Sequence, residues 1–273
     1  MSKVLDWALI LTNPKQPMNN WLSKICALIF LPLCLLLWGC APAQTSASVS
    51  DSEFEAKVLE VIRKNPKVIL DSVQAYNREQ QQKANAARDQ LRQQLKAEPR
   101  LVVRNSPVTG APDLKIVLVE FSDFQCPFCA RAHNTVKEFM AKHGKEVSLT
   151  YKHLPLTEIH PQALPAALAS WSAQQQGKFW EFHDALFSQQ ANLGEELYIK
   201  LANDLGLDIA KFNGDRQSQS AKDAINQDIE LAQGLGINST PTFIMNGIPF
   251  AGAVSLADME SVLNEVKTAS APK

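Results

Sequence analysis

Two cysteines three residues apart, Cys126 and Cys129, are the side chains in this sequence best placed to do chemistry. Pro127 follows Cys126 and suits the first turn of a helix, because its missing N–H would have no partner there anyway. Free backbone N–H groups and the helix dipole at such a position stabilise a thiolate, lowering a cysteine pKa from about 8.5 to roughly 3.5–7.5. Cys126 lies nearest those N–H groups, so it is predicted to be the nucleophile, with Cys129 resolving the mixed disulfide.

Metal binding is the main alternative for such a pair. A zinc site usually brings a second pair of cysteines or histidines, and the chain has none with that spacing. His133 leaves another alternative open, in which Cys126, Cys129 and His133 bind Cu(I), an ion that thiolates suit; otherwise His133 is a solvated helix residue. The remaining histidines show no ligand spacing: His143, His153, His160 and His183. We therefore expect redox chemistry with no metal and no cofactor.

The elements around the cysteines indicate how the pair is positioned. The apolar run from Ile116 to Phe121 has strand composition, and Val136, Phe139 and Met140 continue an apolar face along the helix that follows. The sequence thus predicts a strand that points its C-terminal end at a helix carrying both cysteines. Further predictions are short strands at 101–103 and 147–153, helices throughout 154–237, a hairpin of 242–245 and 248–250 around Asn246-Gly247, and a last helix over about 256–267.

The amino terminus resembles an export signal. Its apolar run, Ile25–Trp38, is 14 residues long. This is short of the roughly 20 that a spanning helix needs, but it fits a secretory signal within residues 1–40. Leu37–Cys40 resembles a bacterial lipobox, in which Cys40 is lipidated, although Trp38 departs from the small residue usual there. An uncleaved signal anchor is the alternative, and a start at Met18 would make residues 1–17 a start-site artefact.

A helical segment separates this signal from the cysteine pair. Residues 41–50 are small and read as a flexible tether, and residues 51–99 are predicted to be helical, with a second helix start at Asn65-Pro66. The apolar stripe of this segment is thin. It fits either association with copies of this chain through residues 52–97 or a solvated spacer, and the first interpretation is favoured.

Composition narrows the function further. A chain of 273 residues with a net charge of −1 and 45% hydrophobic residues is an ordinary globular protein with no nucleic-acid bias. Cys26, Cys34 and Cys40 fall in or beside the signal, so the exported body holds a single thiol pair. In an oxidising compartment, such a pair is more plausibly used on the disulfides of other proteins than kept as a structural bond.

The order of elements resembles the α/β thioredoxin fold: a strand, the Cys-x-x-Cys helix, a strand, and Thr240-Pro241 before a hairpin and a final helix. With its helical insertion, the region 100–268 is similar to the DsbA family of exported thiol–disulfide oxidoreductases. The helical segment before it resembles the ScsC-like branch of that family, in which such a segment oligomerises the protein.

The resemblance implies roles for individual residues. It implies that Pro241 is cis and that Thr240 and Pro241, together with Pro127 and Phe128, contact substrate. Glu120 matches the buried acidic residue of the family, a proton relay for Cys129; a partly exposed strand carboxylate is the alternative. Phe128 stands where DsbA has a histidine and Thr240 where it has valine, which argues for a less oxidising couple, because a phenylalanine cannot become cationic and stabilise the thiolate.

The sequence therefore predicts an exported lipoprotein at the periplasmic face of a bacterial membrane. Its expected activity is thiol–disulfide exchange, including isomerisation, on cysteine-containing exported proteins, with an unidentified membrane redox partner. The alternatives are a periplasmic copper-binding protein and a surface lipoprotein in which the cysteine pair is incidental.

Overall fold

The computed structural model describes residues 50–270. The predicted signal peptide, the predicted lipidation site Cys40 and almost all of the predicted tether lie outside the described residues. The chain divides into two compact units, with the boundary after Arg63. Among residues 50–270, no helix is both long and apolar enough to cross a membrane.

The first unit contributes one described helix, α1 (Asp51–Lys64). All of its residues are exposed, including large apolar side chains such as Phe54, Val58 and Ile62. Such a helix buries nothing within its own unit, so packing does not account for its apolar face.

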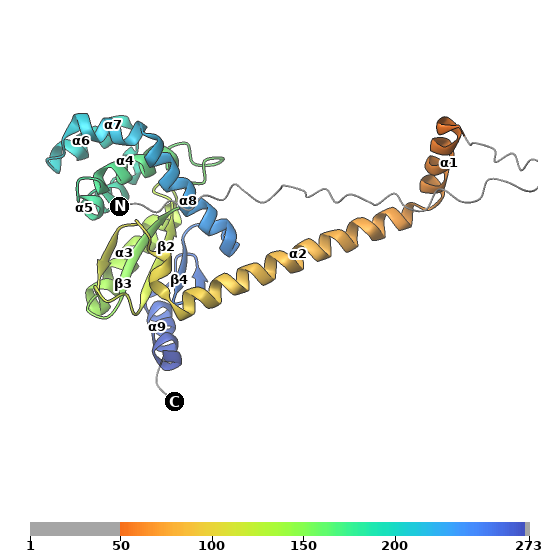
Figure 1. Cartoon of the computed structure of the whole chain (residues 1–273). Helices are drawn as coiled ribbons and strands as arrows, with labels where there is room; N and C mark the ends of the chain where they lie inside the picture. The colour runs from red at the N-terminus through yellow and green to blue at the C-terminus, as the bar shows by residue number, and fades with distance from the viewer. Residues whose placement is uncertain (1–49, 271–273) are drawn as a thin grey trace, which may run out of the picture. The chain divides into compact units, whose positions relative to one another are not determined.

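The second unit is built on a five-stranded mixed sheet, which confirms the predicted α/β thioredoxin-like architecture (Figure 1). The strands are β1 (Val108–Gly110), β2 (Val117–Ser122), β3 (Ser148–His153), β4 (Thr242–Met245) and β5 (Ile248–Ala251). Their order is β1-β3-β2-β4-β5, with β2 parallel to β3 and antiparallel to β4. The central strand β2 is buried along its whole length, as its continuous apolar run predicts.

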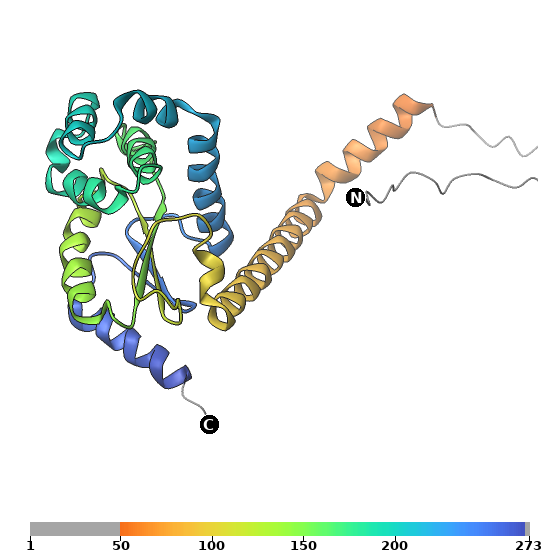
Figure 2. The same ribbon diagram turned by 60° about the vertical axis from the view of Figure 1, so that its left-hand side comes forward.

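Helices cover both faces of this sheet (Figure 2). On one face, α3 (Pro127–His143) and α9 (Leu256–Ser270) pack against Leu118 and Phe243. On the other face, α8 (Gln219–Leu235) packs against Val119 and Ile244. Successive residues of β2 alternate between these two cores, so Glu120 and Ser122 face α3 with Leu118.

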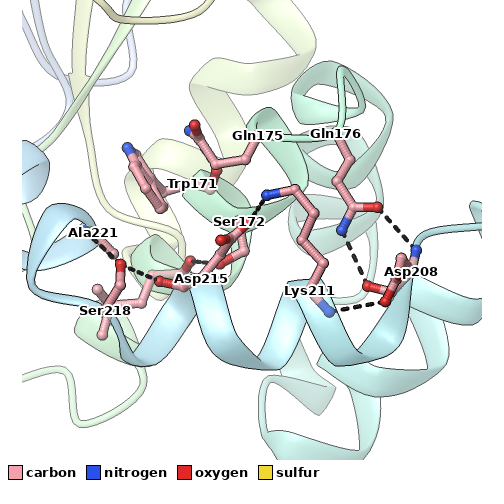
Figure 3. A network of polar contacts seen from close by, with 10 residues as sticks. Trp171, Ser172, Gln175, Gln176, Asp208, Lys211, Asp215, Ser218 and Ala221 are labelled. Atoms are coloured by element: carbon pink, nitrogen blue, oxygen red, sulfur yellow. Dashed lines mark hydrogen bonds and ion pairs between the residues drawn. The ribbon is translucent and has the colours of Figure 1, made fainter.

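The predicted helical insertion consists of short helices between β3 and β4. They are α4 (Ala163–Gln174), α5 (Phe179–Ser188), the 3₁₀ turn η2 (Gln190–Asn192), α6 (Glu195–Asp204), α7 (Ile209–Gln217) and then α8. Side-chain caps set the boundaries of the last two helices: Asp208 accepts a hydrogen bond from Lys211 N, and Ser218 accepts one from Ala221 N (Figure 3). Gln176 also bonds the backbone N–H and C=O of Asp208, which fixes α7 beside α4.

The long helix α2 (Pro66–Ala97) begins at the predicted Asn65-Pro66 start and changes character along its length. It is exposed as far as Ala87, whereas Leu91 and Leu95 pack into the core cluster between the sheet and α8. A boundary between spacer and catalytic domain near residue 100 would therefore cut through this packing.

The predicted strand at 101–103 is wrong. Pro99–Val102 forms a 3₁₀ turn, η1, in which Pro99 supplies the first position, and Val102 and Val103 fill the core beside α8. The edge strand is instead β1, which follows a left-handed residue at Arg104. By contrast, the predicted hairpin is confirmed, because Asn246 and Gly247 adopt the positive φ angles that its tight turn requires.

Candidate active site

Cys126 and Cys129 lie where β2 leads into α3. Cys126 caps the helix in an extended conformation, Pro127 occupies its first turn, and Cys129 is one turn in. Both cysteines are free thiols; Cys129 is fully buried, whereas Cys126 retains 4% of its surface. Both also belong to the apolar cluster formed by the insertion helices, so the pair sits where the sheet domain meets the insertion.

The surroundings of the two thiols separate their pKa values. The neighbouring Cys129 thiol is the main group that lowers the pKa of Cys126 to about 5. Burial opposes this shift, whereas Thr240 and the backbone N–H groups of Phe128 and Cys129 add to it. Burial, followed by the neighbouring Cys126, raises the pKa of Cys129 far above its usual range. At neutral pH, Cys126 is therefore a thiolate and Cys129 a protonated thiol, which is the division of roles expected from the helix position.

The loop before β4 faces this pair. Its Thr240–Pro241 bond is cis, as the resemblance implies. The Thr240 carbonyl oxygen lies 3.5 Å from the Cys126 sulfur, and the Pro241 carbonyl oxygen accepts a hydrogen bond of 2.9 Å from Gly252 N. The structure thus brings Thr240 and Pro241 to the cysteines across more than a hundred residues of sequence.

Pro127 and Phe128 form the outer surface of the same site. Both are exposed, with Phe128 at 51% of its surface. The guanidinium carbon of Arg131 lies 4.3 Å from the centre of the Phe128 ring. The cation thus covers one face of this ring and is not itself one of the redox residues. An exposed aromatic residue beside a reactive thiol offers apolar contact to an incoming chain.

Glu120 is buried beneath the pair, not partly exposed. Only 1% of the Glu120 surface is accessible to solvent, and this burial raises the pKa of its carboxyl to about 7. Within the described residues, Glu120 Oε1, Ser122 Oγ and the Tyr151 hydroxyl are buried with no hydrogen-bond partner of ordinary geometry. Ser122 is nevertheless near enough to lower the pKa of Glu120, Cys129 and Tyr151. These groups form a polar cluster that reaches from Cys129 down to the carboxyl of Glu120.

The buried carboxyl predicts a pH-dependent effect of Glu120→Gln on stability. A carboxyl whose pKa is raised on folding favours the native state only while protonated, so the wild type loses stability relative to the variant as pH rises from about 4.5 to about 7. We expect equal unfolding free energies at pH 4 and a gain of about 3 kcal/mol for Glu120→Gln at pH 8. Urea unfolding of the reduced proteins measures both.

The exposed Glu158 supplies the control for this measurement. Glu158→Gln should change stability little and equally at pH 4 and pH 8, because this side chain lies at the surface and is not part of the core. A Glu120→Gln variant with no extra stability at pH 8 would contradict the assignment of Glu120 as a buried acid with a raised pKa.

Two polar groups that hold the active-site loop were missed from the sequence. The buried Asp123 carboxylate accepts hydrogen bonds from Gln125 N, Leu156 N and His160 Nδ1, the last at 2.7 Å. Gln190, from η2, donates to the carbonyl oxygens of Phe124 and Cys126 at 2.8 and 2.9 Å. The position of Asp123 directly after the strand is a usable turn signal, whereas nothing near Gln190 in the sequence indicates its partners.

His133 is placed differently from both earlier interpretations. It is buried, at 7% exposure, and not a solvated helix residue. In the described part of the chain, neither cysteine belongs to a group of three or more metal-ligating side chains, so His133 does not complete a site with them.

Comparison with known proteins agrees with the geometry of the site. A family model described as thioredoxin matches residues 103–265. A thioredoxin-like oxidoreductase from Silicibacter pomeroyi has 30% sequence identity and a TM-score of 0.56, over 60% of this chain and 94% of that structure. The catalytic domain of Proteus mirabilis ScsC has 24% identity and a TM-score of 0.55, over 64% of this chain and 97% of that domain, a likeness of fold.

Among curated proteins, the chain is similar to part of the Na⁺/H⁺ antiporter NhaA 1 of Mycolicibacterium vanbaalenii. The two are 38% identical over 154 residues, which is 56% of this chain and 25% of the antiporter. The chain thus spans about a quarter of the length of the curated relatives it matches.

Proposed function

The chain belongs to the thioredoxin family, and from this premise we propose that it is a thiol–disulfide oxidoreductase working through Cys126 and Cys129. The observation that carries the proposal is the pair itself: a thiolate at a helix N-terminus, a buried partner thiol, and Thr240 and Pro241 facing them. Catalysis of insulin reduction by dithiothreitol tests it. A protein that does not accelerate insulin precipitation at neutral pH contradicts the proposal.

The proposed reaction begins at Cys126. Its thiolate attacks one sulfur of a substrate disulfide, forming a mixed disulfide and releasing the other substrate sulfur as a thiolate, which takes a proton. Cys129 then loses its proton and attacks Cys126, closing the Cys126–Cys129 disulfide and releasing the second substrate thiol. The substrate gains two electrons that the dithiol loses, and the same steps in reverse oxidise a substrate dithiol.

Cys129 needs a base for this second step, because its own pKa is raised. We assign the proton to Glu120, whose pKa of about 7 suits reversible transfer at neutral pH, with the Ser122 hydroxyl lying near both groups. Substrate binding is assigned to Thr240 and Pro241, beside which an extended chain pairs through its backbone, and to the exposed Pro127 and Phe128.

The preferred direction of electron flow follows from the Cys126 thiolate. Its pKa is lowered to about 5, well below that of an ordinary thiol. A more stable thiolate favours the reduced protein and makes its disulfide more oxidising. The proposed couple is therefore more oxidising than one whose nucleophilic cysteine keeps the ordinary thiol pKa.

The exposed helices favour isomerisation over simple oxidation. From Asp51 to Ala87 every residue is exposed, including Val61, Val68 and Leu70 at about 60% of their surface. Copies of this chain that associate through residues 52–97 would bury those side chains and present several thiol pairs to one substrate. The same segment as a solvated spacer would leave them in water.

The proposed location is the periplasmic face of a bacterial membrane, where exported proteins with cysteines and an unidentified membrane redox partner supply substrates and electrons. We expect Cys40→Ser to remove the lipid anchor and release the protein into the soluble periplasmic fraction, because lipid chains supply the membrane affinity. Fractionation followed by immunoblotting measures the change. Full membrane retention of Cys40→Ser would favour an uncleaved anchor instead.

A further inference from the structure

Three metal-ligating side chains from two helices meet outside the redox pair. His133 comes from α3, and His183 and Asp184 come from α5. One ligand atom of each lies within 4.8 Å of the other two. We propose that these three side chains bind a divalent transition-metal ion of the zinc class, which joins α3 to the helical insertion.

The spacing of the donor atoms fits such an ion. Asp184 Oδ1 lies 3.7 Å from His133 Nε2 and 3.0 Å from His183 Nδ1. Ligands about 2.1 Å from a tetrahedral zinc ion are roughly 3.4 Å from one another, so the two measured distances lie on either side of the required value. The third pair, the two histidine nitrogens, lies within 4.8 Å.

The donors are also in the right chemical form. His133 and His183 are both buried, which favours the neutral imidazole, and each neutral ring has one nitrogen without a proton that can bind a metal ion. Asp184 presents one carboxylate oxygen to both histidines and the other to Lys137. Two imidazoles and a carboxylate suit zinc and its transition-metal neighbours better than calcium or magnesium, which take oxygen ligands.

The surroundings hold the ligands and leave access to them. The Phe187 ring stacks on His133 with centroids 5.0 Å apart, and Tyr151 packs edge-on against His183 at the same distance. Asp184 is partly exposed and opens into a groove that Asn134 and Ser188 help to line. Three protein ligands leave the fourth position of a tetrahedral zinc ion to water, and the groove lined by His133 and Asp184 gives access to the site.

Lys137 gives the site an internal test. Its ammonium group lies 3.0 Å from Asp184 Oδ2, the oxygen opposite the one that faces the histidines. It therefore competes for the carboxylate and repels a cation, so removing its charge should strengthen metal binding. A purely structural role for the cluster predicts no such gain.

The experiment is a calorimetric titration of zinc chloride into the full chain with its five cysteines replaced by serine, which removes competing thiolates. One zinc ion per chain is expected. Asp184→Asn should weaken binding at least tenfold, since losing even an outer-shell partner of a metal ligand costs about 10–100-fold. Lys137→Gln should strengthen it several-fold. Both side chains are partly exposed, so these variants test the site without emptying the core.

Asp204→Asn is the control, because Asp204 is also a partly exposed aspartate paired with a lysine, here Lys200 of the same helix, and is not one of the three proposed ligands. It should leave zinc binding unchanged. As a second measurement, zinc should raise the unfolding temperature of the parent chain but not that of Asp184→Asn. The absence of zinc binding by the parent chain, or equal binding by Asp184→Asn, would overturn the site while leaving the redox proposal standing.

Discussion

Cys126→Ser is expected to reduce catalysed insulin reduction by more than about 10³-fold, to the rate of dithiothreitol alone. Cys126 supplies the thiolate, and a serine hydroxyl at the same helix N-terminus stays protonated at neutral pH and forms no disulfide. The variant should fold normally, since the substitution is nearly isosteric. The measurement is the rate of insulin precipitation, with circular dichroism to show that the fold is retained.

Cys129→Ser is the matched control for this result. Its Cys126 thiolate still attacks, but nothing resolves the product, so the mixed disulfide with substrate should accumulate and appear as a shifted band on a non-reducing gel.

Alkylation of wild-type Cys126 should follow a titration with a midpoint near pH 5. Preferential labelling of Cys129, or trapping of substrate by Cys126→Ser, would reverse the assigned roles.

The sequence predicts those parts of the site whose roles depend only on residues close together in the chain. Helix position alone indicates the chemistry of Cys126, Pro127 and Cys129, because all three lie at the start of one helix. Asn246-Gly247 identifies its hairpin in the same way, from adjacent residues. Pro241 and Glu120 required the resemblance, because only the folded chain brings them to the cysteines.

What the sequence could not indicate depends on burial and on distant partners. Val102 and Val103 have side chains typical of strands, yet they lie at the end of a 3₁₀ turn. There they pack in one core cluster with Leu235 of α8, and this tertiary burial outweighs the local strand preference. His133 looked like a surface residue because its burial comes from α5, some fifty residues further along. Gln190 holds the Cys126 loop from 64 residues away, a relation that no local pattern contains.

The helix α2 shows the same limit at a domain boundary. Its thin apolar stripe is broken at Gln80 in the sequence, and the structure uses the two ends differently: Leu91 and Leu95 belong to the core, whereas Ile69 and Val73 are exposed. Deleting all residues before Leu101 would remove Leu91 and Leu95 from the core. Loss of association could then not be distinguished from loss of folding. The informative cut is before Gln80, which leaves the packed end of α2 in place.

Deletion of the residues before Gln80 is expected to convert an oligomer of this chain into a monomer. The deleted part contains the exposed large apolar residues of both N-terminal helices, so it removes the surface that association would bury. The shortened protein should reduce insulin at the full rate, because every residue of the proposed site remains. It should reshuffle scrambled disulfides about tenfold more slowly or worse, because only linked thiol pairs act repeatedly on one bound substrate at a high effective concentration.

Light scattering on both proteins, together with refolding of a scrambled multi-disulfide protein, measures the two effects. A full-length double variant, Phe54→Ser with Tyr76→Ser, is the matched control, since it keeps the chain length but removes two of the most exposed apolar side chains. It should shift the association equilibrium toward the monomer and lower reshuffling in proportion. If the wild-type protein is already monomeric, the segment is a spacer and the isomerase part of the proposal is wrong. Thiol–disulfide exchange at Cys126 would still stand in that case.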